Sequence, residues 1–198
     1  MPEAAFDKKL NLPSNTGTFV KLKSKGDKIK FRIAATPHYE TIHWIGDREH
    51  VLCGRFNSDD KDAKCNYCED YETAVELGDK KAADAIKPQT VFYYPILLLE
   101  SNTGGNPGKP AIFQFSAKSI HYNIKGYADE GVDVFDCDWL VERTEEQGNY
   151  YPVKRLSDKA LSKELKEQYD LAKKLKLKAR ESKSVVVDND ATPAPEEE

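Results

Sequence analysis

The spacing of one histidine and three cysteines constrains this chain more than any other feature of its 198 residues. His50 and Cys53 form an H-x-x-C pair, eleven residues follow, and Cys65 and Cys68 form a C-x-x-C pair. Each pair can offer two ligands to one ion from a tight turn, and a closed set of one nitrogen and three sulfurs is typical of structural zinc. The residues between the pairs are polar and turn-forming, so this loop has little reason to order without a metal. We therefore predict a structural Zn²⁺ held by His50, Cys53, Cys65 and Cys68.

Other interpretations of these cysteines stay open. They could be ordinary buried cysteines beside a surface histidine. Cys65 and Cys68 could also be a redox pair, although the thioredoxin type needs its C-x-x-C between a strand and a helix, without a second Cys/His pair nearby. The fourth cysteine, Cys137, lies between two aspartates. We expect it to be a small buried residue on a strand, with replacement of His50 as a ligand as a remote alternative.

The charge of the chain is divided unevenly. The last eighteen residues carry six acidic side chains against one lysine, a net charge of −5, and since the whole chain totals −4, residues 1–180 carry +1. We expect residues 182–198 to be a disordered acidic tail and residues 1–16 a flexible arm. The absence of a signal-peptide core and the use of three cysteines for metal predict a cytoplasmic protein in a reducing compartment. No apolar run approaches the roughly 20 residues of a membrane span, which predicts a protein without a membrane partner.

Apolar and polar residues alternate with a period of two through much of residues 17–156, which predicts a strand-rich core. The first two strands, joined at Gly26-Asp27, are expected to form a hairpin with one apolar and one cationic face. Pro95 predicts a bulge or an edge within its strand. The predicted strands cover residues 18–23, 28–33, 39–45, 90–100, 112–115, 132–143 and 150–156, the last two as a second hairpin.

Helical spacing appears in three segments. The first follows Cys68, is weakened at Gly78 and stops at Pro88. The second covers residues 116–127, with Ser116 or Ser119 as its cap, and the third runs from a Ser157 N-cap to Arg180. Together the elements predict a mainly β, α+β fold, namely an OB-type antiparallel β-barrel with an inserted zinc loop and flanking helices. The zinc subdomain is expected around residues 43–88 and a C-terminal amphipathic helix at residues 157–181.

Cationic and aromatic residues are interleaved on the predicted surface. This combination suits single-stranded nucleic acid, because cations follow the phosphates and unpaired bases stack on exposed rings. The plainer interpretation is that basic residues alternate on any half-exposed strand and that most aromatic residues are core. The candidate nucleic-acid contacts are Lys21, Lys23, Lys28, Lys30, Arg32, Tyr39, Trp44, Arg48, Arg55, Phe56, Tyr93, Trp139 and Tyr150.

The basic hairpin from Lys21 to Arg32, the one-His-three-Cys set and the tail ending Glu196-Glu197-Glu198 together resemble the phage-encoded single-stranded DNA-binding proteins. These are helix-destabilising proteins in which an OB fold carries a zinc subdomain and ends in an acidic tail. The resemblance covers residues 18–156 as an order of elements, and only the zinc set is specific. It implies structural zinc, sequence-tolerant binding of single-stranded DNA in replication, recombination and repair, and recruitment of replication and recombination proteins by the tail. For a phage-encoded chain, the compartment is the host cytoplasm.

The sequence departs from this family in two places. In a known member the histidine stands farther from the first cysteine, which makes His43 a rival to His50 as the ligand. The family's basic N-terminal cooperativity motif is matched only by Lys8 and Lys9. Self-association of the protein on DNA is therefore left open.

Two competing functions come from other classes. A zinc-ribbon adaptor or transcription accessory protein would bind duplex nucleic acid or a protein partner. A metal-dependent nuclease would need carboxylates or histidines that converge on an open metal site. The one acidic cluster in a strand region is Asp133, Asp136 and Asp138, which do not share one face, and no catalytic motif accompanies them. We predict that the protein is not an enzyme.

Overall fold

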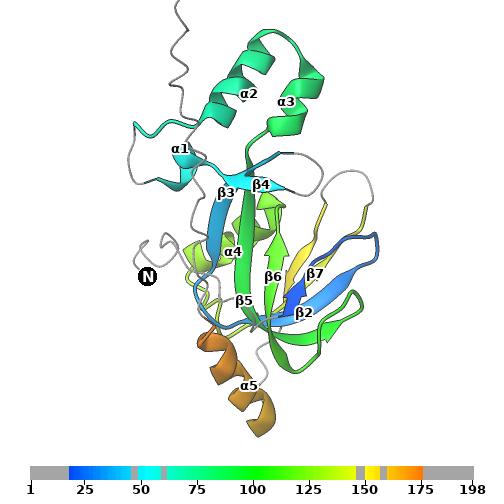
Figure 1. Cartoon of the computed structure of the whole chain (residues 1–198). Helices are drawn as coiled ribbons and strands as arrows, with labels where there is room; N and C mark the ends of the chain where they lie inside the picture. The colour runs from blue at the N-terminus through cyan, green and yellow to red at the C-terminus, as the bar shows by residue number, and fades with distance from the viewer. Residues whose placement is uncertain (1–17, 46–48, 59–61, 146–149, 157–159, 176–198) are drawn as a thin grey trace, which may run out of the picture.

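The computed structural model describes residues 18–45, 49–58, 62–145, 150–156 and 160–175. Within them, eight strands form one sheet and five helices lie around it (Figure 1). The predicted arm and acidic tail fall outside these residues. The strands are β1 (Thr18–Val20), β2 (Lys28–Ile33), β3 (His38–Trp44), β4 (His50–Leu52), β5 (Gln89–Ser101), β6 (Lys109–Phe115), β7 (Asp138–Glu142) and β8 (Val153–Arg155). The helices are α1 (Gly54–Asn57), α2 (Asn66–Glu76), α3 (Lys80–Ile86), α4 (Lys118–Asp129) and α5 (Lys163–Lys173).

The fold is α+β, with a sheet that is antiparallel except at one edge. Strands follow the order β1-β6-β5-β2-β7-β8, and β3 pairs with both β4 and β5. The predicted hairpin of the first two strands is wrong, because β1 runs parallel to β6 whereas β2 lies between β5 and β7. Alternation in a sequence shows which side chains share a face, but it does not show which strand is the partner. The second predicted hairpin is confirmed by the antiparallel pairing of β7 with β8.

Strand β5 is the longest of the sheet, and Pro95 lies in its middle. Along one side β5 pairs with β6, and along the other it pairs first with β3 as far as Tyr93 and then with β2 from Ile96. The Pro95 carbonyl accepts a hydrogen bond of 2.9 Å from the backbone N–H of Ala34, so its nitrogen points toward the same gap between β3 and β2. The proline is tolerated in an internal strand because its missing N–H falls where the partner strand changes.

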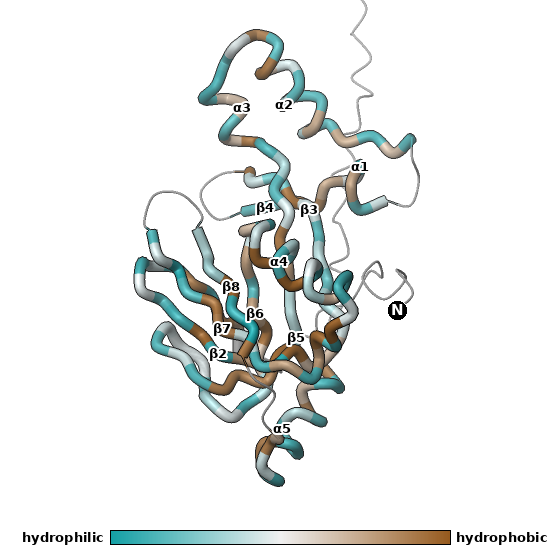
Figure 2. The backbone as a smooth tube through the Cα atoms, turned by 180° about the vertical axis from the view of Figure 1, so that it is seen from behind, coloured by the Kyte–Doolittle hydropathy of each residue, from teal (hydrophilic) through white to brown (hydrophobic). Residues whose placement is uncertain are grey.

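The main core lies between the sheet and α4. Phe31, Phe113, Ile120 and Trp139 are fully buried there. Seen from behind, α4 lies across the sheet, and the strands around it carry long hydrophobic stretches (Figure 2). The N-cap of α4 is Ala117, which makes no side-chain cap, so neither predicted serine caps this helix. Burial of its apolar face therefore holds α4 in place.

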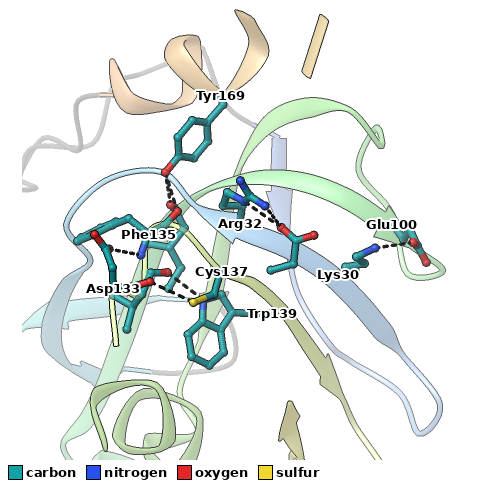
Figure 3. Close-up of polar contacts among 11 residues, drawn as sticks. Lys30, Arg32, Glu100, Asp133, Phe135, Cys137, Trp139 and Tyr169 are labelled. Carbon is teal, nitrogen blue, oxygen red and sulfur yellow. Dashed lines mark hydrogen bonds and ion pairs between the residues drawn. The ribbon is translucent and has the colours of Figure 1, made fainter. Parts of the chain in front are cut away.

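The opposite face of the sheet receives α5. Tyr169 and Ala172 are buried against Ala34 and Leu97. The Tyr169 hydroxyl lies 2.9 Å from two backbone carbonyls, those of Ile33 and Phe135 (Figure 3). The C-terminal helix is confirmed in kind, but it begins later than predicted, at a Ser162 N-cap whose hydroxyl accepts from the Leu165 N–H.

The elements β4, α1, α2 and α3 form a small module at one end of the sheet, where β4 pairs with β3 and the helices α2 and α3 project outward (Figure 1). We call it the metal module, after the zinc ligands that the sequence predicts there. The predicted helical stretch after Cys68 is two helices, because Gly78 adopts a left-handed φ of 71° between them. Asn57 fastens the module to the sheet. Its side chain accepts from the Thr41 N–H at 2.9 Å and donates to the Thr41 carbonyl at 2.6 Å.

Candidate metal centre and adjoining pocket

One histidine and three cysteines come together where the metal module meets the sheet. His43, Cys53, Cys65 and Cys68 are all buried, and their ligand atoms lie within 4.8 Å of one another. His43 comes from β3, Cys53 follows β4, and the other two cysteines lie at the start of α2. Four buried donors in this arrangement are close enough to hold one metal ion.

The distances fit a tetrahedral ion. Zn–S bonds of about 2.3 Å place two sulfurs about 3.8 Å apart, and a Zn–N bond of about 2.0 Å places the nitrogen about 3.5 Å from each sulfur. Here Cys53 Sγ and Cys68 Sγ are 3.4 Å apart. His43 Nε2 lies 3.5 Å from Cys65 Sγ and 3.4 Å from Cys68 Sγ. The donor set is therefore compatible with a structural zinc.

A second contact fixes the orientation of the His43 ring. Its Nδ1 lies 2.7 Å from the carbonyl oxygen of Ile86, the last residue of α3. A proton on Nδ1 donates to that carbonyl and leaves the Nε2 lone pair directed at the cysteines, which is the usual tautomer of a metal-binding histidine. The Tyr67 ring stacks on the His43 ring with centroids 5.7 Å apart. Helix α3 thus contributes to the site without supplying a ligand.

The structure puts His43 in the place that the sequence predicted for His50. In the β3–β4 ladder His43 is opposite Val51, whereas His50 is opposite Trp44. Residues three apart on an extended strand point to opposite faces, so His50 and Cys53 cannot share an ion while β4 remains a strand. The H-x-x-C spacing predicts that His50 and Cys53 meet across a turn. In the structure the β3–β4 ladder instead brings His43, ten residues before Cys53, to the ligand group. Cys137 is outside the group, and its thiol donates to the Asp133 carbonyl at 3.0 Å.

The thiols respond differently to their surroundings. Burial raises the pKa of Cys53 and Cys68 above the ordinary thiol value. Burial also acts to raise the pKa of Cys65, but hydrogen bonds from the backbone N–H groups of Cys68 and Gly54 and from the Cys53 and Cys68 thiols together leave that pKa lowered. A Cβ at Gly54 would lie 2.8 Å from the Lys64 carbonyl, so glycine permits this close approach of α1 to the second cysteine pair. Thiols that hold their protons without metal give them up to bind it.

A half-open pocket of about 220 Å³ is lined in part by Trp44, the residue that follows His43 on β3, and we call it the Trp44 pocket. It is at the end of the sheet where β3 and β6 finish and β5 starts. Its floor is apolar, formed by Leu22, Val91, Phe115 and Ile120. The rest of its lining is polar or aromatic and consists of Lys21, Lys23, Trp44, Gln89, Gln114, Ser116 and Tyr151. Around an apolar floor that includes Phe115, the pocket therefore combines two cations, two further aromatic side chains, two amides and one hydroxyl.

Strand β3 connects the pocket with the metal centre. His43 and Trp44 are neighbours on this strand, so one points to the ligand cluster and the other to the opposite face. The Trp44 indole N–H donates to Gln89 Oε1 at 2.8 Å, and its ring lies edge-on to His50 with centroids 5.4 Å apart. His50 thus supports the wall of the pocket. A metal ion bound by His43 would hold the end of β3 and, with it, Trp44.

The structure brings only part of the predicted nucleic-acid surface together. Lys21, Lys23 and Trp44 meet at the Trp44 pocket, and the exposed Tyr150 precedes Tyr151 in its lining. Sequence reasoning misses Gln89 and Gln114, because uncharged amides within strands carry no signal in the sequence. Both side chains line the same pocket, although the β5–β6 register sets Gln114 opposite Tyr93, four residues along β5 from Gln89.

Other candidates are core or ion-paired residues (Figure 3). Arg32 Nη2 lies 2.7 Å from Asp138 Oδ1 with both side chains buried, and Lys30 pairs with Glu100 at 3.2 Å. At these two positions the predicted cationic face is therefore paired with acidic side chains of the neighbouring strands. Trp139 is fully buried and donates to the Val134 carbonyl. Polar and apolar residues alternate in these segments as they do in a half-exposed strand. However, β2 and β7 each lie between two other strands of the sheet.

The remaining candidates lie away from the pocket lining. Tyr93 is buried, and its hydroxyl donates to Glu40 at 2.6 Å. Tyr39 is exposed but pairs with Phe92, so it faces the side of the sheet opposite to Trp44. Lys28 is exposed at the start of β2, and Phe56 is exposed on α1. Arg55 forms an ion pair with Glu72. Arg48 lies outside the described residues.

No helix in the described segments is both long and apolar enough to cross a membrane. No protein-family model matches the chain, and no curated protein matches its sequence. The function of the protein is therefore inferred from its residues and their geometry.

Proposed function

We propose that this protein binds single-stranded DNA with little sequence specificity, and that the strand passes over the Trp44 pocket. The observation that carries the proposal is the meeting of Lys21 and Lys23 with the half-exposed ring of Trp44 at one opening. Lysines attract phosphates, and an accessible indole offers a stacking surface for an unpaired base. In a duplex the faces of the bases are covered by their neighbours, so this stacking surface favours a single strand.

The metal in this proposal is a structural Zn²⁺. The protein supplies all four donors and all four are buried, so the set is closed in the way that structural zinc sites are. The ion would hold β3 against the metal module and keep Trp44 at the wall of the pocket. A closed site also supports a binding protein over a metal-dependent nuclease. Of the acidic cluster, Asp138 is paired with Arg32, and Asp133 accepts from the Phe135 N–H.

The wider role follows from the resemblance to phage single-stranded DNA-binding proteins. The finer fold of that family is an OB-type barrel, and the long β5, paired with three other strands, supports this assignment. We place the protein in DNA replication, recombination and repair in the host cytoplasm. The acidic segment 182–198 would recruit replication and recombination proteins, and self-association on DNA would extend the coated strand. These roles rest on the resemblance and on the tail's charge.

One observation favours the second candidate, an adaptor that binds duplex nucleic acid or a protein. Leu77 and Val75 on the projecting metal module are 79% and 53% exposed. Acidic side chains surround them on α2. Exposed apolar residues in a charged setting are typical of protein contact sites. This function leaves Lys21, Lys23 and Trp44 without a role, which is why we rank it second.

Removal of the two lysines tests the proposal. A Lys21→Ala, Lys23→Ala double variant is expected to bind oligo(dT) more weakly at low salt. If each lysine neutralises one phosphate, the slope of log K against log salt should fall in magnitude by about 0.7 for each phosphate that is no longer neutralised. The measurement is fluorescence anisotropy of labelled oligo(dT) over a range of salt concentrations.

The matched control is Lys80→Ala with Lys81→Ala, which removes the same charge from α3 in the metal module. It should leave the salt slope near that of the unaltered protein. Equal slopes for the two double variants would move the strand away from the pocket. Binding of a matched duplex as tight as that of oligo(dT) would favour the adaptor instead.

A further inference from the structure

The side-chain amides of the Trp44 pocket have no role in binding phosphates or in stacking. Gln89 lies at the start of β5 and Gln114 near the end of β6. The oxygen of Gln89 already accepts the indole N–H of Trp44 at 2.8 Å. A glutamine amide has one acceptor oxygen and an NH₂ group with two donors, so Gln89 is left to act as a donor. Within the described residues, no hydrogen bond uses the Gln89 nitrogen or the Gln114 amide.

The shape of the pocket limits what these amides could recognise. Its volume is about 220 Å³, below the roughly 300–1,000 Å³ of sites for drug-sized ligands. Apolar side chains form its floor and Trp44 stands at its wall. A small flat heterocycle has apolar faces to meet the ring and the floor, and a polar edge to meet the amides. A single nucleobase has these properties.

We infer that the Trp44 pocket is a subsite for one pyrimidine base, whose pairing edge is read by Gln114 and Gln89 together. The inference rests on the proposed single-strand binding and adds a base preference at one position. Elsewhere along the strand, stacking and phosphate contacts remain indifferent to sequence. The ligand class is a pyrimidine nucleotide within a single strand, thymine and cytosine alike.

The preference follows from the three groups along the pairing edge of each base. Thymine presents O4, N3–H and O2, and cytosine presents the N4 amino group, N3 and O2. In both, the first two groups are one donor and one acceptor, which a glutamine amide such as Gln114 can satisfy in either orientation. The third group is the acceptor O2 in both pyrimidines, and it matches the donor that Gln89 retains.

Purines fail at this third position. Guanine has its N2 amino group there, so a donor would face the Gln89 donor. Adenine has only C2–H, so the Gln89 nitrogen would stay unpaired after losing its water. Either mismatch is unfavourable in a partly enclosed site.

The test compares oligo(dT), oligo(dC) and oligo(dA) of equal length. The unaltered protein should bind both pyrimidine oligomers about tenfold more tightly than oligo(dA), near the lower end of what one good base contact supplies. Gln114→Met and Gln89→Met keep side-chain length but remove the amide. The double variant should lose most of this advantage and keep its affinity for oligo(dA). Gln168→Leu on α5, outside the pocket lining, should leave the ratio unchanged.

A second measurement uses only the unaltered protein. Oligomers of difluorotoluene nucleotides keep the shape of thymine but lack its strong hydrogen-bonding groups, so they should bind about as weakly as oligo(dA). Thymine-like affinity for difluorotoluene, or an unchanged dT-to-dA ratio in the double variant, would overturn the base subsite while strand binding stands. Absence of binding to every oligomer would instead overturn the proposed function itself.

Discussion

A Cys68→Ser variant is expected to bind no zinc and to melt at a much lower temperature than the unaltered protein. The Cys68 sulfur is central to the ligand group, 3.4 Å from both Cys53 Sγ and His43 Nε2. Structural zinc supplies on the order of 10–16 kcal/mol of apparent binding free energy. Whole domains are stable by only about 5–15 kcal/mol. Loss of the ion should therefore release the metal module, whose own buried cluster consists of the three cysteines with Tyr67 packed against them.

Metal content per chain and thermal unfolding of the same samples measure this effect. Cys137→Ser is the matched control, because Cys137 is equally buried but contacts the Asp133 carbonyl in the main core. It should keep one zinc per chain. The same assay separates the two histidines: His43→Ala should release the ion and His50→Ala should retain it. A Cys68→Ser protein with full zinc content and normal melting would contradict the metal centre.

Replacement of Arg32 by methionine is expected to lower the free energy of unfolding by about 3–5 kcal/mol, because it leaves the buried Asp138 carboxylate without its partner. The Arg32–Asp138 pair is almost completely shielded from water, with 8% and 6% of the two side chains exposed. The double variant Arg32→Met, Asp138→Leu should recover most of the loss, since it removes both charges. The measurement is urea unfolding of the single and double variants.

Lys30→Met is the control for this prediction. Its pair with Glu100 is open to solvent on the Glu100 side, with 24% and 69% of the two side chains exposed, so its removal should cost at most about 1 kcal/mol. Normal stability of Arg32→Met together with weakened DNA binding would contradict the structural role of Arg32. It would return this residue to the strand-binding surface that the sequence pattern predicts for it.

Much of the secondary structure could be predicted from the sequence, because alternation and turn residues are local signals. β3, β5 and the pair β7–β8 lie close to where the pattern predicts them. The pairing of the strands was the least accurate part of the prediction. The turn at Gly26-Asp27 exists, with Asp27 accepting from the Ser24 N–H, but β2 then crosses to the far side of β5. The choice of partner strand depends on how the whole sheet packs, and a local period of two in the sequence carries no information about that packing.

For the metal site, the spacing of the cysteines predicted three residues of the ligand group correctly, whereas the H-x-x-C spacing pointed to His50 instead of His43. The C-x-x-C pair lies at a turn into α2, so sequence distance and spatial distance agree. The histidine comes across the β3–β4 ladder, where ten residues of sequence separate two ligands of one ion. Trp44 and Trp139 look alike in sequence, yet one is 38% exposed and the other fully buried. They differ in their place in the sheet, since Trp139 lies on β7, between β2 and β8, whereas Trp44 is the last residue of β3.

The measurement that tests the account most directly is the quenching of tryptophan fluorescence by oligo(dT) at two salt concentrations, with a matched duplex alongside. The chain has two tryptophans, and only Trp44 is accessible to a base. We expect oligo(dT) to quench the emission, salt to weaken the effect and the duplex to have little effect. In Trp44→Phe the quenching should disappear, while labelled oligo(dT) still binds through the lysines. Equal quenching by the duplex, or none by either nucleic acid, would contradict single-strand binding at the Trp44 pocket.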